Sequence, residues 1–235
     1  MKREHTNIIR LLLEDWLPPA VRDLPLLNRL FSRLSGIDLK KCRQLRESIP
    51  TLTPEALNAF YKDYPRIQEG TDNSQKCIDQ IVAGIRGRSV CDVGCGTGYL
   101  LGRISILESP EKLVGVDFSE HAEWTSLENI EFLKHDIFNL PFEDRQFDTV
   151  TSTHTLEHVL DIPAAIRELR RVYSQRLIIV VPRERESIWS FNPHFHYFPY
   201  EHSFLKYLLP LPDQWQIERI GRDYLYIEDR SPNCH

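Results

Sequence analysis

Hydrophobic residues in the first 70 positions recur at the three- and four-residue spacing of amphipathic helices. Residues 6–16 and 21–34 each carry such a stripe. The run Thr53-Pro54-Glu55 supplies an N-cap, a first-turn proline and a first-turn acid, which predicts a helix that continues to about Tyr64. The pattern therefore predicts an N-terminal helical cap over residues 1–70.

From residue 71 onward, short apolar runs alternate with amphipathic stretches. The apolar runs predict strands at 89–93, 113–117, 130–133, 149–153 and 177–181, with a closing hairpin at 215–220 and 223–227. The stretches predict helices at 71–84, 97–107, 119–127, 161–172 and 200–209. Such alternation produces right-handed crossovers and a parallel sheet. The sequence therefore predicts an α/β fold, in which a doubly wound, mostly parallel seven-stranded sheet occupies residues 71–235.

Charge is unevenly distributed along the chain. Residues 1–50 hold ten lysines and arginines against six acidic residues, although the net charge of the whole chain is −5. The remainder is therefore acidic, which argues against nucleic acid as a partner. Two interpretations of the basic, leucine-rich N-terminal segment stay open: a cap that packs on the following domain, which we favour, and a peripheral contact of residues 1–50 with a membrane surface.

Cysteine usage and hydropathy indicate where the protein works. The five cysteines include no C-x-x-C pair, so the sequence contains neither a disulfide framework nor a zinc ribbon. No apolar run reaches the roughly 18 residues that a membrane span needs. The acids that follow the first apolar run do not fit a secretory signal. We therefore expect a protein of the reducing cytoplasm.

The most informative stretch runs from Val90 to Leu100. An apolar run ends at Asp92, glycines follow at 94, 96 and 98, and a helix opens at once. Glycine tolerates positive φ and has no Cβ, so this loop can turn sharply and let a ligand lie against its backbone. A dinucleotide-binding loop, G-x-G-x-x-G, would need its third glycine at position 99, which is tyrosine. The spacing here is G-x-G-x-G instead.

Two further acids follow predicted strands. Asp117 ends the second strand 19 residues after Gly98, where a carboxylate can accept hydrogen bonds from ribose hydroxyls. The alternative role of Asp117 is an N-cap for the helix over 119–127. Asp136 follows the third strand, and the run Pro141-Phe142-Glu143-Asp144-Arg145-Gln146-Phe147-Asp148 leads into the fourth.

These segments resemble the class I S-adenosylmethionine-dependent methyltransferases, and Leu156-Glu157-His158-Val159 resembles their type 11 members. The resemblance covers about residues 72–228 and implies the Rossmann-like methyltransferase fold, with S-adenosylmethionine as cofactor. It assigns the methionine part of the cofactor to Asp92, Gly94, Gly96 and Gly98, the ribose to Asp117, and the adenine to Asp136, Ile137 and Phe118. Thr153 or His154 would lie beside the transferring methyl group.

The resemblance implies an enzyme that transfers a methyl group to an oxygen or nitrogen atom of a small molecule or sugar-like acceptor, including lipid- or polymer-linked ones. Residues 17–25 also resemble methyltransferase-like proteins associated with bacterial surface-polysaccharide synthesis. Aromatic residues and histidines between Trp189 and His202 suit either a small-molecule pocket or a packing layer. The alternative is a non-catalytic or repurposed binding protein, against which the intact glycine loop and Asp117 argue.

Histidines after the fourth strand are the candidate catalytic residues. His158, or failing that His154, would lie where the methyl group emerges and could take a proton from a hydroxyl or an amine. The alternative is that Glu157 and His158 only cap and pack the next helix. The same run partly resembles the metal-associated E-x-x-E-H run of ubiquinone-pathway O-methyltransferases, but His154 replaces its first Glu, and we expect a metal-free site.

Overall fold

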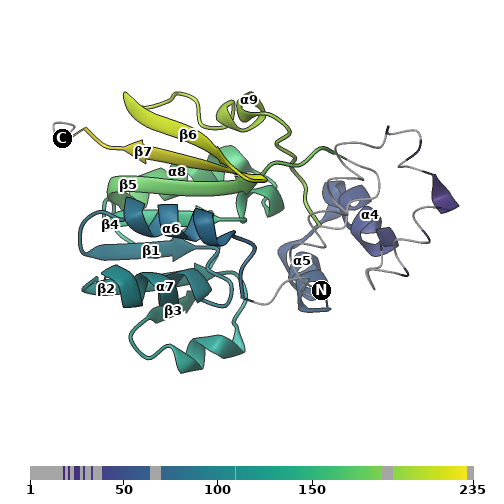
Figure 1. Ribbon diagram of the computed structural model, residues 1–235. Helices are drawn as coiled ribbons and strands as arrows, with labels where there is room; N and C mark the ends of the chain where they lie inside the picture. Colours follow the sequence, from purple (N-terminus) through teal and green to yellow (C-terminus); the bar gives the residue numbers. More distant parts are fainter. Residues whose placement is uncertain are drawn as a thin grey trace. The chain divides into compact units, whose positions relative to one another are not determined.

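The computed structural model describes residues 39–63, 70–108, 110–186 and 193–231, together with seven isolated positions between 18 and 33. The chain divides into two compact units (Figure 1). One unit comprises Met1–Glu69 and Glu184–Pro199, and the other comprises Gly70–Arg183 and Tyr200–His235. The helix expected over 6–16 and most of the stripe over 21–34 lie outside the described residues.

The described part of the N-terminal unit is helical. It contains α4 (Leu39–Glu47), η2 (Ile49–Thr51) and α5 (Pro54–Asp63). As expected, the Thr53 hydroxyl accepts a hydrogen bond from the Ala56 amide at the start of α5. Arg46 donates to the Tyr197 hydroxyl at 2.8 Å, which ties the segment around Tyr197 to α4. None of the helices in the described part of the chain is long and apolar enough for a membrane span. The role of this unit as a cap stays a prediction.

The second unit is built on one seven-stranded sheet, in the order β3-β2-β1-β4-β5-β7-β6 (Figure 1). The first five strands pair in parallel, whereas β7 is antiparallel to both β5 and β6. The prediction of a doubly wound, mostly parallel sheet is confirmed. The strands are β1 (Ser89–Val93), β2 (Lys112–Asp117), β3 (Glu131–Lys134), β4 (Phe147–Thr153), β5 (Tyr173–Pro182), β6 (Gln214–Ile220) and β7 (Asp223–Asp229).

The helices of this unit follow the predicted alternation with two differences. They are α6 (Gln75–Gly84), α7 (Tyr99–Glu108), α8 (Ile162–Val172) and α9 (Glu201–Leu205), with the short turns η3 (Ala122–Ser126) and η4 (Leu156–His158). The expected helix over 119–127 is wrong. Asp117 accepts a hydrogen bond from the Ser119 amide, which turns the chain there and leaves only η3. The helix expected over 200–209 ends at Leu205.

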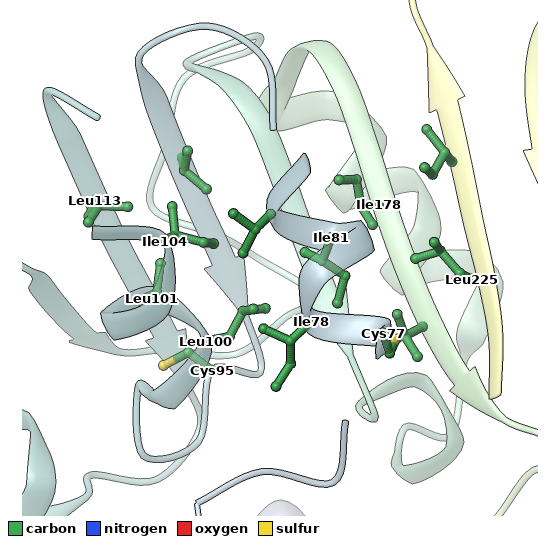
Figure 2. Close-up of a cluster of buried hydrophobic side chains, with 14 of the residues drawn as sticks. Cys77, Ile78, Ile81, Cys95, Leu100, Leu101, Ile104, Leu113, Ile178 and Leu225 are labelled. Atoms are coloured by element: carbon green, nitrogen blue, oxygen red, sulfur yellow. The ribbon is translucent and has the colours of Figure 1, made fainter. Parts of the chain in front are cut away.

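Apolar side chains of α6 and α7 form a core on one face of the sheet (Figure 2). Ile81, Leu101 and Ile104 are fully buried there and pack with strand residues such as Ile178. Burial of each such side chain stabilises the fold by about 1.5–3 kcal/mol. The apolar positions that recur at helical spacing in the sequence of α6 and α7 therefore lie on the helix faces that pack against the sheet.

The connection over 141–148 has a structural role at the amino edge of the sheet. The Arg171 guanidinium donates to the carbonyls of Leu140 and Phe142 and pairs with Glu168. Asp148, at the start of β4, accepts hydrogen bonds from the amides of Arg88 and Ser89. These contacts lower the pKa of Asp148 against the opposing effect of its partial burial. The residues of this motif therefore fix how β4 enters beside β1, at the edge opposite to the glycine loop.

A buried carboxylate joins α8 to the last strand. Glu228 is fully buried and receives two hydrogen bonds from Arg170, at 2.9 and 2.6 Å. The hydroxyls of Tyr173 and Tyr226 donate to the same carboxylate, at 3.1 and 2.8 Å. Burial and the charge of Glu228 raise the pKa of both tyrosines, so they stay protonated donors. Four donated hydrogen bonds offset the cost of burying this charge.

Removal of Glu228 should therefore destabilise the sheet domain. Glu228→Ala leaves the half-buried Arg170 without its counter-charge and the hydroxyls of Tyr173 and Tyr226 without their acceptor. We expect a loss of about 3–5 kcal/mol in the free energy of unfolding, measured by urea denaturation. The control is Glu111→Ala, which removes an exposed ion pair with Arg88 (N–O distance 2.6 Å, side chains 62% and 73% exposed) and should cost less than about 1 kcal/mol. Equal losses in the two variants would contradict this account.

Candidate donor and catalytic site

The candidate site lies at the carboxyl edge of the parallel strands. Strand order reverses between β1 and β4, because β2 and β3 follow on one side and β5 on the other. Ligands of open α/β sheets bind at such a switch point. The loops that meet at this edge follow β1, β2, β3 and β4. Every site residue predicted from the sequence lies in one of these loops or at the carboxyl end of the strand before it.

The three glycines of the loop after β1 all have positive φ, at +79° for Gly94, +52° for Gly96 and +81° for Gly98. A Cβ on Gly94 would lie 2.0 Å from the Thr155 hydroxyl oxygen, and one on Gly98 would lie 2.6 Å from the Phe132 ring. Packing therefore requires glycine at these two positions. A Cβ on Gly96 would meet nothing within 4 Å. Gly96 thus presents bare backbone to open space.

Asp117 is bonded to the glycine loop. One carboxylate oxygen accepts from the Gly96 amide at 2.9 Å, and the other accepts from the Ser119 amide at 3.1 Å. The His121 Nε2 atom lies 3.5 Å from the second oxygen. The suggested helix N-cap role is wrong, because His121 is the N-cap residue of η3. Each carboxylate oxygen has two lone pairs, so Asp117 can still accept hydrogen bonds from a ligand.

Asp92 is a buried acid just before the loop. Its side chain accepts a hydrogen bond from the Thr151 hydroxyl at 2.7 Å, and the residue is 2% exposed. Burial raises the pKa of Asp92 to about 7, because the single hydrogen bond does not offset the lost solvation and the Asp117 charge adds to the shift. Near neutral pH, Asp92 is therefore a carboxyl group poised between its two protonation states.

Two aromatic residues that sequence reasoning missed fix the loop. The Trp124 indole donates to the Gly96 carbonyl at 2.8 Å, and its ring stacks on Phe132 at 4.8 Å between centroids. Phe132 in turn lies against Gly98. No local pattern signals these contacts, since Trp124 and Gly96 are 28 positions apart in the chain. The peptide groups of the loop are thus held before any ligand arrives.

The residues predicted to surround adenine lie at the ends of β2 and β3. Phe118 is 37% exposed, whereas Ile137 is buried. Asp136 is exposed, and its carboxylate accepts from the Phe138 amide at 3.0 Å. Phe138, which was not predicted, is also exposed. An exposed carboxylate and exposed aromatic residues on the loops after β2 and β3 suit a flat, polar-edged ring system such as a purine.

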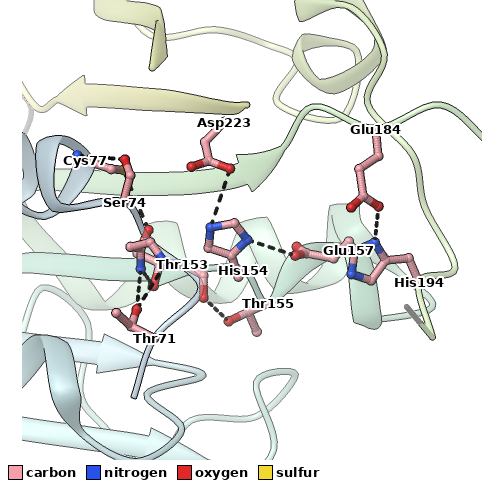
Figure 3. A network of polar contacts seen from close by, with 11 residues as sticks. Thr71, Ser74, Cys77, Thr153, His154, Thr155, Glu157, Glu184, His194 and Asp223 are labelled. Atoms are coloured by element: carbon pink, nitrogen blue, oxygen red, sulfur yellow. Dashed lines mark hydrogen bonds and ion pairs between the residues drawn. The ribbon is translucent and has the colours of Figure 1, made fainter. Parts of the chain in front are cut away.

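The end of β4 carries Thr153 and the histidines. The Thr153 hydroxyl accepts from the Asn73 amide group at 3.0 Å, and the Thr155 hydroxyl donates to the Thr153 carbonyl at 3.1 Å (Figure 3). His158 ends η4, is half-buried, and donates its backbone amide to Thr155. Thr153 and His158 thus lie on the loop after β4 that borders the glycine loop through Thr155 and Gly94.

His154 is a largely buried histidine, with its side chain 12% exposed and with carboxylates on both sides (Figure 3). Its Nδ1 atom lies 3.6 Å from Glu157, and its Nε2 atom lies 3.7 Å from Asp223. Burial alone would lower the pKa of His154, but these two carboxylates outweigh burial and raise it to about 9. The ring is therefore an imidazolium at neutral pH and cannot accept a further proton. Of the two histidines predicted as a base, His154 does not suit that role at neutral pH, and the role of His158 stays a prediction.

The residues of the aromatic and histidine cluster over 189–202 are divided between the two units. Trp189 and Phe191 lie outside the described residues, and the members from Pro193 to Pro199 belong to the N-terminal unit. Tyr200 and His202 belong to the sheet unit and stack on each other at 5.3 Å.

Known proteins that are similar to this chain include methyltransferases. Residues 91–180, from β1 to the end of β5, match the sequence profile of a methyltransferase domain. Demethylmenaquinone methyltransferase of Staphylococcus epidermidis is 36% identical over 94 residues, which is 37% of this chain and 39% of that protein. The chain thus spans about two-fifths of the length of this relative.

Solved structures show the same fold. An S-adenosylmethionine-dependent methyltransferase from Aquifex aeolicus superposes with a TM-score of 0.54 at 19% identity, over 75% of this chain and 98% of that one. Magnesium protoporphyrin IX methyltransferase from Synechocystis PCC 6803, solved with bound S-adenosylhomocysteine, gives 0.53 at 21% identity, over 83% and 100%. The domain match and this fold both agree with the resemblance predicted from the sequence: residues 91–180 match a type 11 methyltransferase domain, and the sheet unit has the fold of S-adenosylmethionine-dependent methyltransferases.

Proposed function

We propose that this protein transfers the methyl group of S-adenosylmethionine to an oxygen or nitrogen atom of a small-molecule acceptor. The observation that supports this most directly is the position of Gly96 at the switch point of the sheet, where its Cα faces open space and Asp117 and Trp124 hold its two peptide groups. Bound S-adenosylmethionine would supply an activated methyl group on a sulfonium sulfur. The chain's own task is then to hold donor and acceptor in line and to remove a proton.

The donor would be held by the residues that the sequence predicted. Gly94, Gly96 and Gly98 offer backbone to its methionine part, with Asp92 beneath them. Asp117 keeps free lone pairs for the ribose hydroxyls, and the loop after β3 offers Asp136 and Ile137 to adenine, with Phe118 beside them. Because Trp124 and Asp117 already fix both polar groups of Gly96, the loop needs little ordering when the donor binds.

The acceptor would be a small molecule that carries an ionisable proton. The curated relative is named for a quinone and the structural neighbour for a porphyrin, and both are ring systems. A glycan-type acceptor is the other class that we propose, from the resemblance of residues 17–25. In either case His158 would receive the proton, since His154 is already protonated.

Donor binding is the first test of this proposal. Gly96→Ala should weaken binding of S-adenosylhomocysteine at least tenfold in calorimetry, because the new methyl group would occupy the space that the donor needs. Gly221→Ala is a matched control: Gly221 also has positive φ, at +62°, and also has nothing within 4 Å of an added Cβ. The control should bind normally. Binding of NAD in place of S-adenosylhomocysteine would contradict the proposal.

The buried acid gives a second prediction, on stability. Asp92 keeps its proton up to about pH 7 in the folded state but releases it near pH 3.8 when unfolded, so the wild type loses stability as pH rises between these values. Asp92→Asn keeps an acceptor for Thr151 but does not titrate. Its free energy of unfolding relative to the wild type should rise by about 2–3 kcal/mol between pH 5 and pH 8.

The same variant should bind S-adenosylhomocysteine more weakly, because a residue that lowers stability at a site is kept for function. Asp136→Asn, which changes an exposed carboxylate at the same edge of the sheet, is the stability control and should show little pH-dependent difference. A constant stability difference for Asp92→Asn across this pH range would mean that the carboxylate is ionised throughout.

The catalytic role of His158 is tested by its removal. His158→Ala should lower methyl transfer by about 10²–10⁴, with normal S-adenosylhomocysteine binding. The assay uses labelled S-adenosylmethionine and a panel of quinols, phenols and glycosides as acceptors. His202→Ala, at an exposed position in α9, is the control. Unchanged methyl transfer in His158→Ala would mean that His158 is not the base and that the protein promotes transfer only by positioning donor and acceptor.

A further inference from the structure

His154 combines a rare backbone conformation with burial. Its φ is +51°, in the left-handed region that residues other than glycine seldom adopt. Its backbone amide donates to the Val180 carbonyl at 2.9 Å, so the chain is still aligned with β5 at this residue and turns away directly after it. A residue whose backbone is held in such a conformation needs surrounding contacts that compensate for the strain.

The compensating contacts come from two separate elements. Asp223 begins β7 and pairs with Pro182 at the end of β5, whereas Glu157 lies in η4, within the same loop as His154. The two carboxylates approach opposite nitrogens of the ring, at 3.7 and 3.6 Å (Figure 3). The side chain thus links the loop after β4, across β5, to the first residue of β7.

Both ring nitrogens can face carboxylates favourably only when both carry protons. The raised pKa of His154, about 9, agrees with this geometry, and the third charge that contributes to it is Asp72, which lies just before α6. The interactions of His154 with all three carboxyl groups favour the imidazolium. His154 is therefore a fixed positive charge in this loop.

We propose that His154 is a positioning residue, whose imidazolium clamps the loop over 154–158 between Asp223 and Glu157 and thereby sets the place of His158 and Thr155. The inference rests on the proposed function insofar as His158 is the base. The same loop also contacts the candidate donor site, because the Thr155 hydroxyl occupies the space that a side chain on Gly94 would need.

Two variants separate charge from backbone conformation. His154→Asn removes the charge but keeps a residue that tolerates the left-handed region. Asp223→Asn removes the distant partner and leaves the histidine in place. If the charge holds the loop, amide hydrogen exchange at His158 and Val159 should become at least tenfold faster in both variants. Exchange in the ladder between β5 and β7 should not change, and His202→Asn should leave both regions as in the wild type.

A histidine NMR titration gives an independent measure of the clamp. The His154 ring resonance, assigned by its loss in His154→Asn, should titrate near pH 9 in the wild type and move toward the ordinary value of about 6.5 in Asp223→Asn. Wild-type exchange rates in His154→Asn, or a His154 titration that does not respond to Asp223→Asn, would overturn the proposal.

Neither measurement depends on catalysis. Calorimetry with S-adenosylhomocysteine, run on the same wild-type preparation, reports on the proposed function separately. Failure of the wild type to bind it would overturn the proposed function, whereas the exchange and titration results decide the clamp.

Discussion

The hydrogen bond from the Gly96 amide to Asp117 organises the candidate donor site. It joins the loop after β1 to the end of β2, two strands that pair along their whole length from Ser89 to Val93. A carboxylate acceptor makes this bond stronger than one between neutral groups. Trp124 holds the carbonyl of the same residue, so both polar groups of Gly96 are satisfied by the protein. A ligand at this point therefore meets a backbone that is already ordered, and the cost of ordering is met during folding.

Three ionisable groups of the sheet unit that are fully or largely buried differ in what compensates for their lost solvation. Glu228 receives hydrogen bonds from an arginine and two tyrosines, and its role is structural. His154 lies between carboxylates of opposite charge to its own. Asp92 receives one hydroxyl hydrogen bond, and its raised pKa shows that its burial is not compensated. The uncompensated group is the one directly before the glycine loop, which is where a functional site is expected to cost stability.

A motif can identify a family without carrying its chemistry. The run over 141–148 was among the strongest grounds for the resemblance, yet the structure places it at the amino edge of the sheet. Its residues are held by Arg171 and, through Asp148, by the amides before β1. The physical need it meets is the entry of β4 into the sheet. The proposed chemistry depends instead on the loops at the carboxyl edge.

The sequence by itself determined the sheet, because apolar runs and helical stripes are local patterns that depend on residues a few positions apart. It also located the glycine loop and Asp117, since glycine spacing and a strand-ending acid are local too. Tertiary structure decided those features that depend on contacts between residues far apart in the chain. The Asp117 hydrogen bond to Ser119 replaced an expected helix with a turn, and residues 184–199 joined the N-terminal unit. Above all, Asp223 lies far along the chain from His154, and only the pairing of β7 with β5 brings its carboxylate to that ring and turns a candidate base into a fixed cation.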